Sequence, residues 1–341
     1  MPRFIHRLAR YWGGQAGGGR LGRGRPGLSG EFIFVQDQDT SMQAMSPIPL
    51  LSRSSRPAVA ARSCARRKWG VLLCTTVALA GGCADQPEAP IVNTFFNSET
   101  TVTAARLDAL LPTDVLLLGE QHDAREHQRL EQQVIAILAG RGLLAAVALE
   151  MAPTGTSTED LKPSASEEQT RRALEWSDKR WSWAAYAPAV MTAVRAGVPV
   201  LGANLPRGQF RESMAERELD TRLPAPTFNA LQQAVRTGHC NLLPEEQIKP
   251  LTRVQIAKDI TMADTVRQAA LPGKVVVLLT GHGHADRSLG VPLHLSADLR
   301  TKAIRLQAEN DETSAAQAFD STWRTPALPD KDHCAELKER L

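Results

Sequence analysis

Several features that would assign this 341-residue chain to a simple class are missing from it. None of its five cysteines has a CxxC neighbour, which argues against a cysteine-bound zinc site. The apolar run Trp69–Ala80 has 12 residues, whereas a membrane-spanning helix needs about 20. Positive charge is in excess only in residues 1–82, where 12 basic side chains accompany 3 acidic ones. The remaining residues hold 28 basic and 34 acidic side chains, a net charge of −6, so we expect no nucleic-acid partner.

Aromatic residues are scarce as well, at 5% of the chain, and only two residues are tyrosines. Tyr186 is the only tyrosine after Cys83, and it lies close to Trp181 and Trp183. These three side chains form either part of a packed core or a surface for a planar ligand. If a phenolate of this chain binds ferric iron, as an axial tyrosine does in some haem proteins, that residue must be Tyr186.

The N-terminal segment has the composition of a disordered region followed by a signal peptide. Residues 12–30 are rich in glycine and arginine and lack apolar periodicity, so we expect residues 1–60 to be disordered. A start at Met42 or Met45 would give the signal its usual length, so most of residues 1–60 is expected to lie upstream of the true start. Residues 61–82 then supply a basic stretch, the short apolar run and small residues at the cut, as in secretory signal peptides.

Cys83 directly follows Ala80, Gly81 and Gly82, a pattern similar to the bacterial lipobox. We therefore expect residues 61–82 to be a lipoprotein signal peptide, Cys83 to be lipidated, and residues 83–100 to be a linker. An ordinary signal peptide or an uncleaved anchor is the alternative. Ala84 after the cysteine favours the outer membrane, with the protein anchored by lipid and facing the periplasm.

Two cysteines remain after the expected lipidation site, Cys240 and Cys334. An exported protein with two cysteines favours one disulfide bond, which here would tie the C-terminal tail to the domain. Two free thiols are the alternative.

Strand and helix patterns alternate through the rest of the chain. Apolar runs without polar alternation are typical of strands buried in a parallel sheet, and the strands are predicted at 114–119, 145–149, 198–202, 274–280 and 303–307. The fold class is therefore α/β, a mainly parallel sheet flanked by helices over residues 101–335. Residues 205–270 are expected to form a helical cap over the strand ends. Residues 274–280 are expected to run into a turn of sequence GHGH.

Ligand-type side chains follow several of these strands directly. Because parallel strands end at one edge of a sheet, where α/β proteins place their chemistry, we expect these side chains to converge. They are Glu120, His122, Glu150, Asn204, His282 and His284. His127 lies one turn into the helix that follows, and from the sequence it faces either the site or solvent.

Several motifs in order resemble the ChaN-type haem-binding lipoproteins. They are LLLGEQHDAREH, LEM at 149–151, WSWAAY, GVPVLGANLPR, GHCNLLPEE, VQIAKDITMA and GHGHADRSLGVP. This family is placed in a superfamily with Tiki proteases, TraB/PrgY proteins and erythromycin-esterase-like enzymes.

The resemblance implies an exported protein that binds haem or iron in uptake. It also implies a homodimer that holds haem by a tyrosine between subunits, and an outer-membrane haem receptor as partner. The candidates for haem binding are Tyr186, His122, His127 and His284.

A metal-dependent hydrolase is the alternative function, and whether the protein is an enzyme stays open. In that case Glu120, His122, Glu150 and His284 would hold a divalent metal that activates water, and Glu120 or Glu150 would serve as the general base.

Overall fold

The structure, a computed structural model, describes residues 101–311 and 318–340. The expected disordered segment, the signal peptide, Cys83 and the linker lie outside these residues. The predicted 101–335 domain is therefore covered except for residues 312–317. Within the described residues, no helix is long and apolar enough to cross a membrane.

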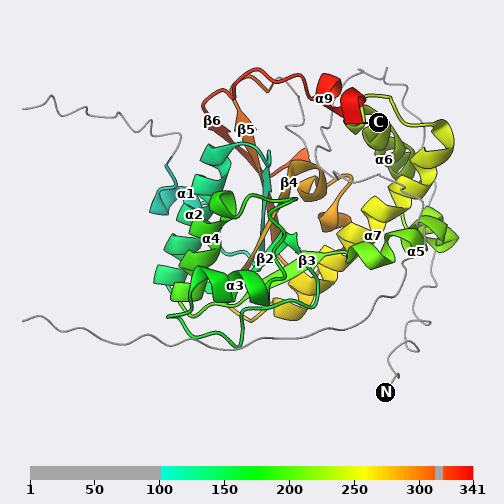
Figure 1. The fold of residues 1–341 in the computed structure, drawn as a ribbon. Helices are drawn as coiled ribbons and strands as arrows, with labels where there is room; N and C mark the ends of the chain where they lie inside the picture. The colour runs from blue at the N-terminus through cyan, green and yellow to red at the C-terminus, as the bar shows by residue number, and fades with distance from the viewer. Residues whose placement is uncertain (1–100, 312–317, 341) are drawn as a thin grey trace, which may run out of the picture.

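A six-stranded parallel sheet organises the domain, with the strand order β3-β2-β4-β1-β5-β6 (Figure 1). The strands are β1 (Val115–Glu120), β2 (Leu144–Pro153), β3 (Val200–Asn204), β4 (Val275–Gly281), β5 (Thr301–Ala308) and β6 (Ser321–Thr325). The predicted α/β class with a parallel sheet is confirmed. The sixth strand, β6, was not predicted, because its sequence STWRT has too few apolar residues to stand out. It lies at an edge and pairs only with β5.

Helices cover both faces of the sheet. They are α1 (Ala104–Asp108), α2 (Arg125–Gly140), α3 (Glu167–Ala173), α4 (Trp183–Arg195), α5 (Phe210–Ala215), α6 (Ala225–Gly238), α7 (Glu245–Ala269), α8 (His282–Ala285) and α9 (His333–Arg340). Successive side chains of a strand point to opposite faces. Leu116 and Leu118 of β1 accordingly belong to the core under α2 and α4. Val115 and Leu117 belong to the core under α7.

The predicted cap over residues 205–270 is formed by α5, α6 and the first half of α7. Buried side chains of α6 and α7, such as Phe228 and Ile256, make a separate core together with Leu219 of the 3-10 helix Arg217–Thr221. The second half of α7 packs on the sheet through Met262, Ala263 and Val266. Helix α7 is therefore both part of the cap and one of the flanking helices.

Helix α4 begins at Trp183, five residues before Pro188. Pro188 lies inside the helix, although proline usually breaks one. The carboxylate of Asp178 accepts a hydrogen bond from the Trp183 N–H at 3.1 Å, which supports the first turn. Burial of Trp183 and Tyr186 in the core, both on α4, also favours this helix.

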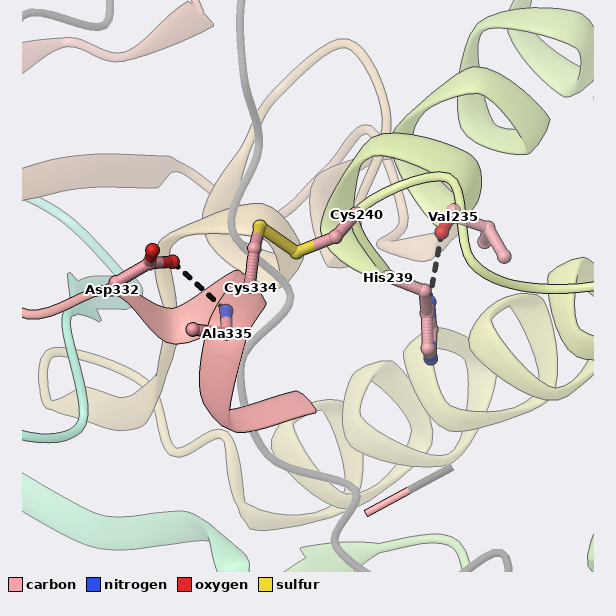
Figure 2. The surroundings of a disulfide bond; sticks show 6 residues. All are labelled: Val235, His239, Cys240, Asp332, Cys334 and Ala335. Carbon is pink, nitrogen blue, oxygen red and sulfur yellow. Dashed lines mark hydrogen bonds between the residues drawn. A yellow bond between two sulfur atoms is a disulfide. The ribbon is translucent and has the colours of Figure 1, made fainter. Parts of the chain in front are cut away.

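A disulfide bond joins Cys240, just after α6, to Cys334 in the first turn of α9 (Figure 2). The two Cα atoms lie 5.6 Å apart. The structure thus contains the bond that the sequence predicts, and the bond holds the C-terminal tail against the cap.

Candidate functional site

The carboxyl ends of β1, β2 and β4, which are neighbours in the sheet, bring four predicted residues together. His122 Nδ1 lies 2.8 Å from Glu120, and His122 Nε2 lies 4.0 Å from Glu150. On the other side, His284 Nε2 lies 3.5 Å from Glu150. The predicted GHGH turn is the short helix α8, which carries His284 in its second half. The expected convergence of Glu120, His122, Glu150 and His284 is therefore present.

Asp259 of α7 also belongs to this group, although it was not predicted from the sequence. Its carboxylate lies 2.6 Å from His284 Nδ1 and is buried. An available signal was its position three residues from Ile256 and Met262, on the apolar face of a helix. The structure thus contains a continuous series of acidic and imidazole groups, in the order Glu120, His122, Glu150, His284 and Asp259.

Glu150 stands at the centre of this series and is held as a carboxylate. One of its oxygens accepts hydrogen bonds from the Thr280 hydroxyl at 2.7 Å and from the Gly281 N–H at 2.8 Å. Burial alone would raise its pKa, but the charges of His284 and His122 outweigh burial and lower the pKa to about 2. The Asn204 side chain donates to the Glu150 backbone carbonyl at 2.7 Å, so Asn204 supports the site from β3.

Both histidines of the series have a raised pKa. Burial lowers the pKa of His122, but its hydrogen bond to Glu120 and the charge of Glu120 outweigh burial. Burial likewise lowers the pKa of His284, and the charges of Glu150 and Asp259 reverse the direction. In each imidazole Nδ1 faces an outer carboxylate and Nε2 faces Glu150. The arrangement can therefore hold and transfer protons along the strand ends.

Tyr186 points from α4 into this site and is almost fully buried. Its hydroxyl donates a hydrogen bond to Glu120 Oε1 at 2.6 Å, and Gln128 of α2 donates to the other oxygen of Glu120. Burial and the negative charge of Glu120 raise the pKa of Tyr186 well above its ordinary value. The phenol is therefore a neutral donor that positions Glu120.

Glu131, also on α2, is a second buried acid that was not predicted from the sequence. Burial and the neighbouring charge of Glu120 raise the pKa of Glu131 well above its ordinary value, which favours the neutral carboxylic acid. Its place in a helix rich in polar residues offers no signal in the sequence.

His127 was a predicted haem-binding residue, and its surroundings do not support that role. Its Nδ1 accepts a hydrogen bond from the Gln121 N–H at 2.9 Å, and its Nε2 lies 3.0 Å from the Thr325 hydroxyl. These contacts require the neutral tautomer with the proton on Nε2. The imidazole is fully buried and bridges the β1–α2 loop to β6, so it supports the site from behind.

The neutral state of His127 predicts a loss of stability in acid. Burial, with a smaller contribution from His282, lowers the pKa of His127 to about 3. The unfolded chain binds a proton here below about pH 6.5, and the folded chain does not until about pH 3. Stability therefore falls as the pH drops through this window. Between pH 6.5 and 4 we expect wild type to lose about 3 kcal/mol more unfolding free energy than His127→Gln, measured by urea denaturation. Equal losses in the two proteins would refute this account.

His282, the first histidine of α8, lies beside β1. It is buried against Gly119, where an alanine Cβ would lie 2.8 Å from the His282 Cα. Burial and the charge of Arg305 lower its pKa to about 4. It therefore packs as a neutral side chain, and Gly119 allows α8 to approach β1 this closely.

The predicted metal ligands lie together, but they are not arranged around a common point. Among the described His, Cys, Asp and Glu side chains, no group of three or more has the geometry to hold a metal ion. The Nδ1 atoms of His122 and His284 face carboxylates, and Glu150 already accepts two hydrogen bonds. The arrangement thus does not support the divalent-metal prediction.

Comparison with known proteins assigns the chain to a family. Residues 106–295 match the family described as "Haem-binding uptake, Tiki superfamily, ChaN". The chain belongs to this family. A comparison with curated proteins gives no match. The haem-bound ChaN of Campylobacter jejuni is similar in structure, with 25% identity over 59% of this chain and 84% of that chain and a TM-score of 0.51.

Two further solved structures are more distant. The erythromycin esterase EreC in an open conformation has 13% identity over 62% of this chain and 75% of that chain, with a TM-score of 0.39. The type III effector HopBA1 has 14% identity over 63% of this chain and 88% of that chain, with a TM-score of 0.39.

Proposed function

We propose that this protein binds haem at the strand-end site. The observation that carries the proposal is membership of the ChaN family, together with the similarity to the Campylobacter protein, whose structure is described as binding haem cofacially. The resemblance of the sequence motifs to ChaN-type lipoproteins also implies binding of haem or iron.

The side chains of the site differ in how well they suit haem iron. Tyr186 does not fit as a ligand where it lies, because its phenol is buried and donates to Glu120. His122 fits better. Its side chain is 14% exposed, against 5% for His284. Its Nδ1 is held by a carboxylate, as is usual for histidines that bind metals through the other nitrogen. His122 Nε2 is therefore the atom we assign to haem iron.

Trp181 lies beside the proposed iron ligand. Its ring meets the His122 imidazole edge-on, with the ring centroids 4.7 Å apart. An indole beside the ligand offers apolar contact area to a flat macrocycle. Trp181 belongs to the same buried core as Trp183 and Tyr186, and it is the tryptophan of the predicted aromatic patch whose ring contacts His122.

A haem titration tests this assignment. Wild type is expected to develop a Soret band on addition of ferric haem, and His122→Ala to bind at least about tenfold more weakly, because a lost iron ligand costs at least about 1.4 kcal/mol. Tyr186→Phe is expected to keep the band and most of the affinity. His239→Ala, a histidine substitution beyond the site, serves as the control.

The outcomes distinguish His122 from Tyr186 as the iron ligand. A Soret band that collapses in Tyr186→Phe and survives in His122→Ala would return the ligand role to the tyrosine. No Soret band in wild type would refute haem binding altogether.

The cellular setting is part of the same proposal and rests on the sequence alone. We infer that the chain is exported, lipidated at Cys83, anchored to the outer membrane facing the periplasm, and acts in haem or iron uptake with an outer-membrane receptor. A homodimer enclosing haem is implied by the family resemblance. Labelling with a palmitate analogue that is lost in Cys83→Ser tests the anchor, and sedimentation with and without haem tests the dimer.

A further inference from the structure

The C-terminal segment 328–334 crosses from the β5–β6 side of the sheet to the cap. At its start, the Asn310 side chain donates to the Leu328 carbonyl at 3.0 Å and accepts from the Leu328 N–H at 2.9 Å. Asn310 follows β5 closely, so this end of the segment is held at the carboxyl edge of the sheet. Figure 1 shows the red chain leaving β6 and running to α9, which lies beside α6.

The other end of the segment is held covalently. Cys334 is bonded to Cys240, and the Asp332 carboxylate accepts from the Ala335 N–H at 2.9 Å, which caps α9 (Figure 2). Cys240 and Asn241 have φ values of 56° and 57°, a left-handed conformation that non-glycine residues rarely adopt. The backbone at the end of α6 therefore adopts an uncommon conformation at the residue that forms the disulfide bond.

Between these two ends the segment contacts the loop that carries the proposed haem ligand. His333 Nε2 lies 3.8 Å from the carboxylate of Asp123, the residue directly after His122. Both side chains are partly exposed, at 25% and 40%, and such surface contacts hold two segments together weakly. The disulfide is thus the strong attachment at this end of the segment.

We propose that residues 328–334 form a strap beside the mouth of the strand-end site, and that the Cys240–Cys334 disulfide locks it closed. Reduction by a dithiol breaks the sulfur–sulfur bond. The dithiol supplies two electrons and two protons, leaves as its own disulfide, and Cys240 and Cys334 become thiols. Of the contacts with the described residues named above, the released strap then keeps the Asn310 amide pair and the weak His333–Asp123 contact, so it opens and exposes His122. Ligand access is therefore under redox control.

The first test needs no ligand and uses the full chain. Hydrogen exchange of the amides in 328–340 and diethyl pyrocarbonate modification of His122 are measured by mass spectrometry in the oxidised and dithiothreitol-reduced protein. Both rates are expected to rise about tenfold or more on reduction, because the segment opens locally without global unfolding. Amides of α3, which lies away from the strap, are the internal reference and should not change.

A double variant supplies the matched control. Cys240→Ser with Cys334→Ser is expected to show the fast rates with or without dithiothreitol, so the effect belongs to this disulfide. If that variant does not fold, the reduced wild type still decides the question. Equal exchange and equal His122 modification in oxidised and reduced wild type would overturn the strap.

A second experiment measures haem binding. It rests on the proposed function and is therefore separate from the exchange and modification measurements. Haem is added to the double variant and to oxidised wild type without reductant, and the association rate is expected to be about tenfold higher in the variant, since access no longer waits for the strap to open. Faster exchange and modification with no haem binding in either protein would support the strap and refute haem binding. Haem binding at equal rates would overturn redox control of access.

Discussion

Gly202→Ala is expected to destabilise the protein by about 3 kcal/mol or more. Gly202 lies in β3, where its N–H donates to the Thr156 carbonyl at 2.9 Å. A Cβ atom at this position would overlap the Pro153 carbonyl oxygen and the Thr156 hydroxyl. Because the first of these is a backbone atom, the end of β2 has to move to make room. Urea denaturation followed by circular dichroism measures the loss.

Gly140→Ala is the matched control, since it makes the same chemical change at the end of α2. An added Cβ there meets nothing within 4 Å. Alanine also favours helix over glycine by roughly 0.5–1 kcal/mol, so the variant is expected to be neutral or slightly more stable. Similar losses in the two variants would show that the packing between β2 and β3 is not what makes Gly202 necessary.

Glu150→Gln is expected to cost about 3 kcal/mol of unfolding free energy at pH 7. The pKa of Glu150 falls from 4.5 to about 2 in the folded protein, and each unit corresponds to about 1.4 kcal/mol. Its folded pKa is lowered, so this stabilisation is present above pH 4.5 and is lost as the pH falls toward 2. The variant should therefore differ most from wild type at neutral pH and converge with it in acid.

The same substitution should also lower the pKa of His284, because the charge of Glu150 is the leading cause that raises it. An NMR titration of the imidazole measures this change, and urea denaturation from pH 2 to 7 measures the stability. Glu159→Gln removes the charge of an exposed loop residue and is expected to change stability by less than about 0.5 kcal/mol. An unchanged pKa of His284 in Glu150→Gln would contradict the electrostatic coupling described above.

Much of the fold is readable from local patterns. The uninterrupted apolar run before Gly119 predicts a strand buried on both faces, and Val115–Leu118 is buried completely. Because parallel strands end at one edge, the same reading predicts that Glu120, Glu150 and His284 meet. The pattern fails where the signal is short or mixed. Strand β6 has few apolar residues. Pro188 is unfavourable within a helix, yet it lies inside α4, which packing stabilises.

The side-chain contacts of the site are harder to predict from the sequence, as Asp259 illustrates. Its contact with His284 joins α7 to α8 across 25 residues of chain, and no spacing rule links the two. The sequence shows that Tyr186 is the only tyrosine after Cys83. The hydrogen bond of Tyr186 to Glu120, 66 residues away in the chain, is a contact that the sequence does not predict.

Local order along the chain is enough to specify the parallel sheet, the residues at its carboxyl edge and the two cysteines free to pair, because periodicity and strand direction are properties of short segments. The tertiary structure alone establishes which nitrogen of each histidine faces Glu150, that Tyr186 donates to Glu120, and that the tail lies against the loop bearing His122. These features depend on how distant segments pack together, and burial then sets the protonation of each group by removing water from around it.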